Sequence, residues 1–297
     1  MPHDVIVIGG SYAGLSAAMQ LARARRQVLV IDAGLPRNRF ATGAHGFLGQ
    51  DGRPPEDILR DAIAQLEAYP TFDLTHGEAT DARRDGDGFI VTLADGSEQR
   101  AARLVLATGV TDELPPIPGM TERWGRTVLH CPYCHGYEVA DLPLGVIAAH
   151  PMSAHQAGLI PDWGPTTYFT QGVFEPDAEQ AAHLSARGVQ IERTPVVELL
   201  GDAPALEGVR LTDGRTVTVG ALFVAPMTRP SSPLAGLLGC EFEDGPMGPH
   251  VRVDEWKQTT VPGVYAAGDA ATPMHNATLA SAAGVLAGVG AHQSLLR

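Results

Sequence analysis

Two cysteines separated by two residues, Cys131 and Cys134, carry the strongest chemical signal in this sequence. Thiols at this spacing can close into a small disulfide ring and reopen, so the pair can exchange disulfides with an external thiol. A helix that begins at the pair would favour a thiolate and lower a thiol pKa. His135 follows directly and can accept a thiol proton near neutral pH, although a surface histidine at a helix start is the plain alternative. The pattern predicts thiol–disulfide exchange, with Cys131, Cys134 and His135 as catalytic residues.

Other cysteine chemistries explain the pattern less well. Cys-x-x-Cys-His also occurs where c-type haem is attached, but that requires export, and the apolar run at residues 5–8 is too short for a signal peptide. A zinc site would need a second ligand pair, whereas Cys240 stands alone, 106 residues after Cys134. We expect no metal, and we expect Cys240 to be a small buried apolar residue.

A nucleotide-binding pattern occupies the first forty residues. An apolar strand at residues 5–8 leads into a glycine turn and an Ala-rich helix, and a second strand at residues 28–31 ends in Asp32. The glycines let a pyrophosphate approach the helix N-terminus, and the acid can accept a ribose hydroxyl bond; a serine replaces the middle glycine of the motif. The predicted cofactor-binding residues of this turn are Gly9, Ser11, Tyr12, Ala13, Gly14 and Asp32.

The middle of the chain repeats this layout. A strand at 144–149, a helix at 154–160 and a strand at 166–170 follow a Pro-rich link at 113–119, and a second link spans 226–233. The sequence predicts an α/β fold of two Rossmann-like, three-layer dinucleotide-binding domains, the second inserted into the first. The predicted limits are 1–114 with 229–297 for the first domain and 115–228 for the second.

Length, charge and hydropathy restrict the partners. The 297 residues suffice for two domains with buried cores, and the net charge of −13 argues against nucleic acid or an anionic membrane. No apolar run reaches the length needed to cross a bilayer. We expect a cytoplasmic protein, where three cysteines do not form a structural disulfide framework.

Together these motifs resemble the low-molecular-weight thioredoxin reductases, which are class II pyridine nucleotide-disulfide oxidoreductases. The resemblance covers nearly the whole chain and also includes the turn Ala107-Thr108-Gly109 and the segment 261–269. It implies a homodimer and an FAD domain built from both chain ends. It further implies that Cys134 faces the flavin while Cys131 exchanges with substrate. The run Cys-Pro-Tyr-Cys-His-Gly-Tyr-Glu resembles the gliotoxin-type dithiol oxidases, which close disulfides in small molecules.

The C-terminal segment completes the expected flavin site. Asp269 would hold a ribityl hydroxyl, and a helix starting near Ala277 would face the negative charge of a reduced flavin. The family has Arg-Gln before this helix, and here Met274, His275 and Asn276 would line the isoalloxazine pocket instead. For His45, in a loop at 33–52, ordinary loop packing is the expectation, and a contact with the flavin is the alternative. The further predicted cofactor-binding residues are Thr108, Gly109, Gly268, Asp269, His275, Asn276 and Ala277.

The second nucleotide motif departs from the family pattern. Ala148 and His150 occupy the two glycine positions, where a Cβ obstructs a pyrophosphate, and Pro151 removes an N–H donor. We therefore predict weak or no NADPH use and an FAD enzyme that oxidises a dithiol or draws electrons from another carrier. An NADPH-dependent thioredoxin reductase with a divergent loop and a non-catalytic FAD-binding redox sensor stay open as alternatives. The partner would be a small dithiol or disulfide, or a thioredoxin-like protein.

Overall fold

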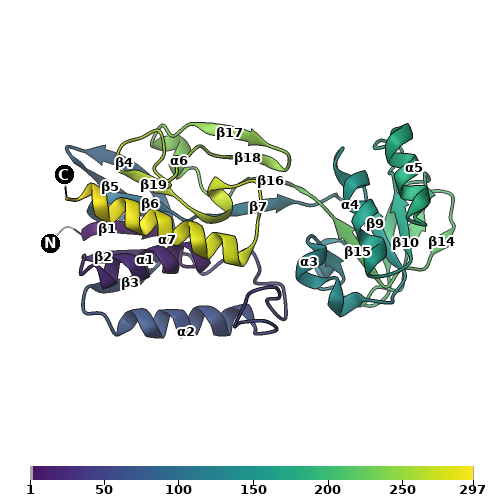
Figure 1. Cartoon of the computed structure of the whole chain (residues 1–297), viewed down its shortest axis with the longest axis horizontal. Coiled ribbons are helices and arrows are strands. Elements are labelled where there is room, and N and C mark those ends of the chain that lie inside the picture. Colours follow the sequence, from purple (N-terminus) through teal and green to yellow (C-terminus); the bar gives the residue numbers. More distant parts are fainter. Residues whose placement is uncertain (1–2, 297) are drawn as a thin grey trace.

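The computed structural model describes residues 3–296 and shows two α/β units arranged end to end (Figure 1). One unit contains both ends of the described chain, and the other contains its middle. This arrangement confirms the predicted α/β class with a second unit inserted into the first. Within residues 3–296 no helix is long and apolar enough to span a membrane.

The first unit is built on a seven-stranded sheet with the order β3-β2-β1-β6-β5-β4, in which β19 also pairs with β6. Strands β1, β2, β3, β6 and β19 are parallel to one another. The valines of β1 face one apolar cluster and its isoleucines face another, so the strand is buried on both faces. The strands are β1 (His3–Ile8), β2 (Val28–Asp32), β3 (Phe72–His76), β4 (Ala79–Asp85), β5 (Gly88–Leu93), β6 (Glu98–Leu106) and β19 (Val264–Ala266).

Three helices pack against the valine face of this sheet. They are α1 (Tyr12–Arg23), α2 (Pro55–Glu67) and α7 (Ala277–Ser294). Glycines allow α7 to lie directly on α1, because a Cβ at Gly284 would come within 2.0 Å of the Ala13 carbonyl oxygen. This contact fixes the N-terminus of α7 beside the first glycine turn. The opposite face carries α6 (Leu234–Leu237), β17 (Phe242–Gly245) and β18 (Gly248–Val251).

The second unit is built on a five-stranded parallel sheet with the order β11-β10-β9-β15-β8. Apolar clusters fill both of its faces. Its strands are β8 (Val128–Leu129), β9 (Leu144–Ile147), β10 (Thr166–Phe169), β11 (Gln190–Glu192) and β15 (Ala221–Val224). Around them lie α3 (Pro132–His135), α4 (Ser153–Leu159), α5 (Ala178–Ala186) and the antiparallel strands β12 (Val196–Leu200), β13 (Gly208–Leu211) and β14 (Thr216–Val217).

The two units are joined by a pair of antiparallel strands, β7 (Val110–Glu113) and β16 (Met227–Pro230). The links expected at 113–119 and 226–233 therefore meet as a hydrogen-bonded ribbon at their start, which the sequence did not indicate. The limits 1–114, 115–228 and 229–297 fall at this ribbon and stay a prediction.

Candidate active site

The first glycine turn has the shape of a pyrophosphate cradle. Gly9 has a φ of +106°, and a Cβ there would lie 2.2 Å from the Ala107 carbonyl oxygen. A Cβ at Gly14 would lie 1.8 Å from the Gly9 oxygen, so only glycine at position 14 allows the turn to pack this closely against α1. Ser11 is the N-cap of α1, yet its side chain makes no capping bond to any described residue. The first N–H groups of α1 are thus free to bind an anion.

Asp32 ends β2 beside this turn, as predicted for a ribose ligand. Its Oδ1 accepts a hydrogen bond from the backbone N–H of Gly10 at 3.0 Å. A Cβ at Gly10 would meet the Asp32 Cβ at 2.8 Å, so only glycine allows this approach. The contact holds the carboxylate at the turn, and its other oxygen can accept a hydroxyl bond.

One cavity of about 650 Å³ connects this turn with the cysteine pair. Its volume lies within the range of ordinary ligand sites. It is lined by nearly all the predicted site residues: Gly9, Ser11, Tyr12, Ala13, Asp32, Thr108, Gly109, Cys131, Cys134, His135, Gly268, Asp269, His275, Asn276 and Ala277. The glycine cradle, the carboxylate beside it and the cavity between both units fit FAD as the bound group.

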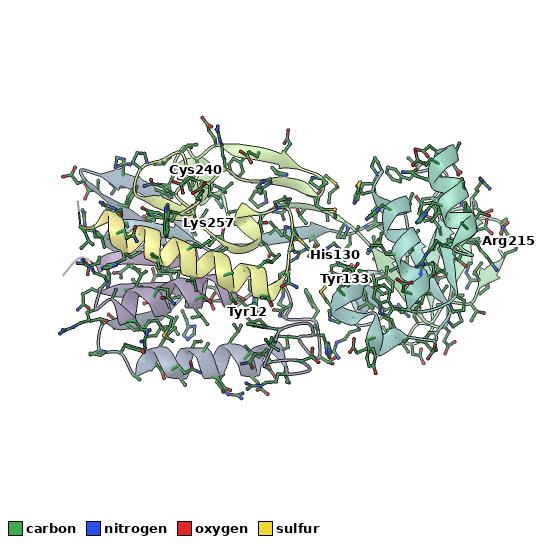
Figure 2. The ribbon with its side chains drawn as sticks, viewed as in Figure 1. Tyr12, His130, Tyr133, Arg215, Cys240 and Lys257 are labelled. Carbon is green, nitrogen blue, oxygen red and sulfur yellow. A yellow bond between two sulfur atoms is a disulfide. The ribbon has the colours of Figure 1, made fainter. Side chains whose placement is uncertain are left out.

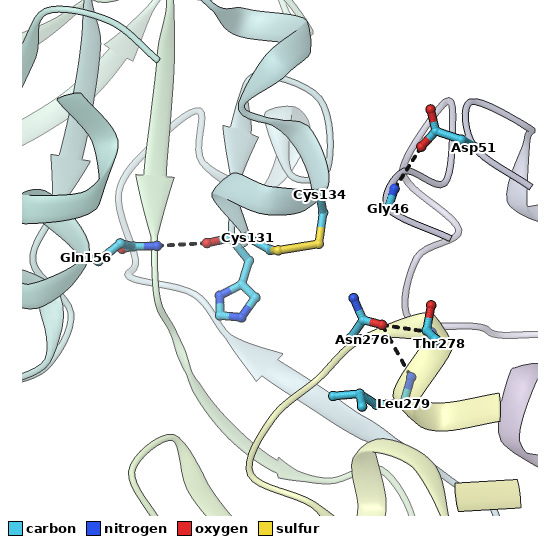
Figure 3. The surroundings of a disulfide bond; sticks show 9 residues. Gly46, Asp51, Cys131, Cys134, Gln156, Asn276, Thr278 and Leu279 are labelled. Carbon is cyan, nitrogen blue, oxygen red and sulfur yellow. Dashed lines mark hydrogen bonds between the residues drawn. A yellow bond between two sulfur atoms is a disulfide. The ribbon is translucent and has the colours of Figure 1, made fainter. Parts of the chain in front are cut away.

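The N-terminus of α7 forms the wall of this cavity near the cysteines (Figure 3). Asn276 is the N-cap, and its Oδ1 accepts hydrogen bonds from the N–H groups of Thr278 at 2.8 Å and Leu279 at 3.3 Å. The positive end of an 18-residue helix therefore adjoins the cavity. Met274, predicted to line the pocket as well, is 67% exposed and is not among the residues that line this cavity.

Cys131 and Cys134 form a disulfide, with their Cα atoms 5.2 Å apart (Figure 3). Cys131 is the N-cap of α3 and Cys134 lies in its single turn of four residues. So short a helix carries little dipole, and the expected stabilisation of a thiolate by the helix start is correspondingly small. The side chains around the pair must supply proton acceptors instead.

His135, the predicted acid–base residue, lies directly after the pair and lines the cavity. Burial lowers the pKa of His135, nearby His45 lowers it further, and Glu138 opposes the shift. Its Nε2 atom is buried and has no hydrogen-bond partner among residues 3–296. A neutral imidazole with a free nitrogen beside the disulfide can take up a thiol proton.

His130, directly before Cys131, is a second half-buried imidazole that the sequence analysis missed (Figure 2). Burial and the nearby Arg37 charge lower the pKa of His130 to about 4, and Asp112 opposes the shift. Its Nδ1 atom is buried without a hydrogen-bond partner in the part of the chain that is described, and the residue lines the main cavity. The sequence signal that could have identified His130 is its position directly before the cysteine pair, which matches the position of His135 directly after it.

A charged network that the sequence did not indicate holds the cavity wall together. Arg37 donates to both oxygens of Asp112, at 2.9 and 2.5 Å, and to Asp269 at 2.8 Å. Asp112 belongs to β7, so the network ties the connecting ribbon to both ends of the first unit. Asp269 faces the cavity, and its hydrogen bond with Arg37 fixes its position there. Burial lowers the pKa of His275 nearby, with Asp269 opposing.

The loop at 33–52 packs against the glycine turn and places His45 at a separate cavity. Asn38 donates to the Tyr12 hydroxyl at 3.1 Å, and the rings of Phe47 and Tyr12 meet edge to face. His45 lines a second cavity of about 330 Å³ instead of the main one. This agrees with loop packing, the expected role of His45, and not with the alternative of a flavin contact, because the loop directs the ring toward His135.

The second nucleotide turn, after β9, is filled by its own side chains. The Ser153 Oγ accepts the N–H groups of Ala149 at 3.0 Å and His150 at 3.2 Å. The His150 Nδ1 accepts the N–H of Met152 at 3.1 Å. Both side chains are buried. At the end of β10, the Thr170 hydroxyl donates to Glu175 Oε1 at 2.8 Å, and Arg193 donates to the other oxygen of Glu175 at 3.0 Å.

The remaining cysteine has the structural role that was expected. Cys240 is buried, and its Sγ lies 3.4 Å from the Thr259 hydroxyl. Burial raises the pKa of the Cys240 thiol, which keeps it protonated.

Comparison with known proteins agrees with this geometry. Residues 3–284 match the family described as pyridine nucleotide-disulphide oxidoreductase. A solved oxidoreductase from Agrobacterium tumefaciens is 51% identical, with a TM-score of 0.95 over 100% of this chain and 99% of its own. The structure of HlmI is 38% identical, with a TM-score of 0.93 over 99% and 93%. Thioredoxin reductase tcpT of Claviceps purpurea is 31% identical over 99% of this chain and 94% of its own. The chain therefore belongs to the pyridine nucleotide-disulphide oxidoreductases.

Proposed function

We propose that this protein is an FAD-dependent oxidase of small dithiols that makes little or no use of NADPH. The observation that carries the proposal is the filled turn after β9, where Ser153 and His150 occupy the N–H groups that a pyrophosphate would need. The contrast with the open turn at Gly9, in the same chain, supports FAD as the one bound dinucleotide.

The cysteine pair and its histidines supply the dithiol chemistry. A substrate thiol gives its proton to His135, and the thiolate attacks Cys131, so that the Cys131–Cys134 bond breaks and a mixed disulfide forms. The second substrate thiolate attacks the substrate sulfur of that bond, which releases a cyclic disulfide and the Cys131 thiolate. Two electrons have then passed from the substrate to the pair, while one substrate proton has gone to His135 and the other to the Cys134 thiolate. A bound FAD would supply the acceptor for these two electrons and the route to oxygen or another acceptor.

The residues around the cavity would hold FAD at three places. The turn at Gly9 would bind the pyrophosphate, Asp32 a ribose hydroxyl and Asp269 a ribityl hydroxyl. The N-terminus of α7 would stabilise negative charge on the isoalloxazine. His130 and His135 both adjoin the cysteines and line the cavity, so either can move the protons.

An NADPH-dependent thioredoxin reductase is the second candidate, and the name of the Claviceps purpurea relative favours it. We further propose a cytoplasmic homodimer, in which the exposed Leu279, Val285 and Leu286 of α7 contact a second copy. The third candidate is a redox sensor, which would have the same disulfide but would not turn over substrate.

One anaerobic experiment separates these functions. The purified yellow protein is mixed with dithiothreitol, NADPH or NADH, and flavin absorbance near 450 nm is recorded. We expect bleaching by the dithiol alone, followed by recolouring and oxygen consumption in air. Rapid, stoichiometric bleaching by NADPH would favour the reductase, and bleaching without any turnover in air would favour the sensor.

A further inference from the structure

The loop at 33–52 holds one imidazole in a fixed position at the back of the cysteine helix. An antiparallel bridge closes this loop, since Ala44 donates to the Arg53 carbonyl at 2.8 Å and Gly52 donates to the Ala44 carbonyl at 2.9 Å. A Cβ at Gly43 would lie 3.0 Å from the Nε2 of His45. The absence of a side chain at Gly43 therefore makes room for the His45 ring.

The His45 ring lies between His135 and two carboxylates. The ring centroids of His45 and His135 are 6.2 Å apart and meet at 79°. The His45 Nδ1 is 3.4 Å from Glu138 Oε1 and 3.8 Å from Asp51 Oδ1. Asp51 is itself held by the N–H of Gly46 at 2.8 Å (Figure 3). One imidazole thus connects the buried partner of the cysteines with acids at the surface.

Exposure increases along this chain of groups. His135 has a buried Nε2, the His45 side chain is 22% exposed, Glu138 is 39% exposed and Asp51 is 71% exposed. His135 lines both the main cavity and the second cavity of about 330 Å³, whereas His45 lines only the second. That volume holds several waters, so a water can bridge the two rings. Arg126 is the remaining charged group on this cavity.

We propose that His45 is a positioning residue that exchanges the proton of His135 with solvent. The inference rests on the proposed function, because it concerns the proton that a substrate thiol gives to His135. That proton passes from the His135 imidazolium through a bridging water to His45, and from there to Glu138 or Asp51 and the bulk. No electrons move in this step, since both stay with the sulfur atoms.

The test compares His45→Gln and His45→Ala with the wild-type protein. The rate at which dithiothreitol reduces the Cys131–Cys134 disulfide is measured from pH 5.5 to 9 by acid quench, alkylation and mass spectrometry. We expect both variants to be slowed about tenfold near pH 7, less than for loss of a direct acid or base. Added imidazole should restore His45→Ala in proportion to its concentration and leave His45→Gln slow, because glutamine fills the space.

A second measurement needs no turnover. The pKa of His135 is followed by NMR in the resting, oxidised protein, and it should rise in His45→Gln, because His45 is one of the groups that lower the pKa of His135. Leu48→Ala changes the same loop at a side chain that is 99% exposed and serves as the matched control, with rates expected within twofold of wild type.

The outcomes separate the inference from the proposed function. If the wild-type disulfide resists dithiothreitol at every pH, the proposed function fails. If the wild type is reduced but His45→Gln and His45→Ala match it within twofold, the proton exchange through His45 is wrong. If both variants are slow, imidazole does not restore His45→Ala and the His135 titration is unchanged in His45→Gln, then His45 has a structural role only. That outcome also overturns the proton exchange through His45.

Discussion

The Oγ atom of Ser153 accepts a hydrogen bond from the backbone N–H of Ala149 at 3.0 Å. The same oxygen accepts the N–H of His150, and the Ser153 side chain is fully buried. A pyrophosphate at a helix N-terminus binds through N–H groups of this kind. Ser153 therefore completes the turn from within the chain and competes with any nucleotide for the same donors.

Ser153→Ala should destabilise the protein. The substitution leaves two backbone N–H groups without their acceptor, at a cost of about 1–3 kcal/mol. For a protein of this size the expected fall in Tm is several degrees, measured by thermal unfolding followed by circular dichroism. We expect no gain in NADPH affinity from this change alone, since His150 and Pro151 remain in the turn.

Ser281→Ala is the matched control for that variant. The Ser281 hydroxyl donates to the Ala277 carbonyl within α7, at a half-buried position. Its loss leaves the backbone of the helix intact, so Tm should change much less than in Ser153→Ala. Equal changes in the two variants would contradict the role assigned to Ser153.

Gly284→Ala should separate α7 from α1 and weaken FAD binding. The added Cβ would come within 2.0 Å of the Ala13 oxygen, so one helix must move. Overpacking of this kind costs about 1–3 kcal/mol or more. The measurements are Tm and the ratio of bound FAD to protein after gel filtration.

Gly236→Ala provides the comparison for this change. Apart from its chain neighbours and the backbone of its own helix, no atom of the described chain lies within 4 Å of where its Cβ would be built. The FAD content of Gly236→Ala should equal that of the wild type, whereas Gly284→Ala loses FAD. Full FAD content in Gly284→Ala would show that α7 does not need this close contact.

Local patterns were sufficient to predict the main parts of the site. Each of these parts is a short motif whose residue types and spacing have a known physical reason. They are the turn from Gly9 to Gly14, Asp32 at the end of β2 and the Cys131–Cys134 pair. The repeated strand–turn–helix order also predicted the second unit. These features depend on neighbours in the chain, so their spacing carries the information.

The network around Arg37 could not be predicted in this way. Arg37 and Asp269 are 232 residues apart, and Arg37 and Asp112 are 75 apart, so no local spacing connects them. The same holds for the pairing of β7 with β16 and for the contact of His45 with His135. The side-chain direction of Met274 could not be predicted either, because a loop, unlike a helix or strand, has no period that fixes which way a side chain points.

The folded protein should lose stability as the pH falls from about 6.5 to about 4. Burial lowers the pKa of His130 to about 4, and it also lowers the pKa of His135, His150 and His275. The unfolded chain binds these protons below about pH 6.5, whereas the folded protein resists them, so acid favours unfolding. Urea unfolding at pH 7 and pH 5 measures the difference.

His130→Gln should reduce this pH dependence, because the imidazole with the strongly lowered pKa no longer has to be protonated on unfolding. The exposed His155→Gln serves as the control and should leave the difference between pH 7 and pH 5 unchanged. A His130→Gln protein with the wild-type pH dependence would mean that His130 is solvated more than its surroundings indicate.

Cys131→Ser and Cys134→Ser should separate the roles of the two sulfurs. Each variant should keep FAD, because the glycine turn at Gly9 and the N-terminus of α7 are unchanged. Neither should transfer electrons from dithiothreitol to FAD, since the disulfide is absent. The yellow colour should therefore persist under anaerobic dithiol in both variants, and loss of colour in either one would contradict a relay through the pair.

The remaining thiol in each variant should differ in reactivity toward 5,5′-dithiobis(2-nitrobenzoate). If Cys131 is the sulfur that meets substrate, Cys134→Ser should form the mixed disulfide rapidly, and Cys131→Ser should do so several-fold more slowly while FAD is bound. Both thiols line the same cavity, so the difference should shrink when FAD is removed. Faster reaction of Cys131→Ser in the FAD-bound protein would reverse the two roles, with Cys134 as the sulfur that substrate attacks.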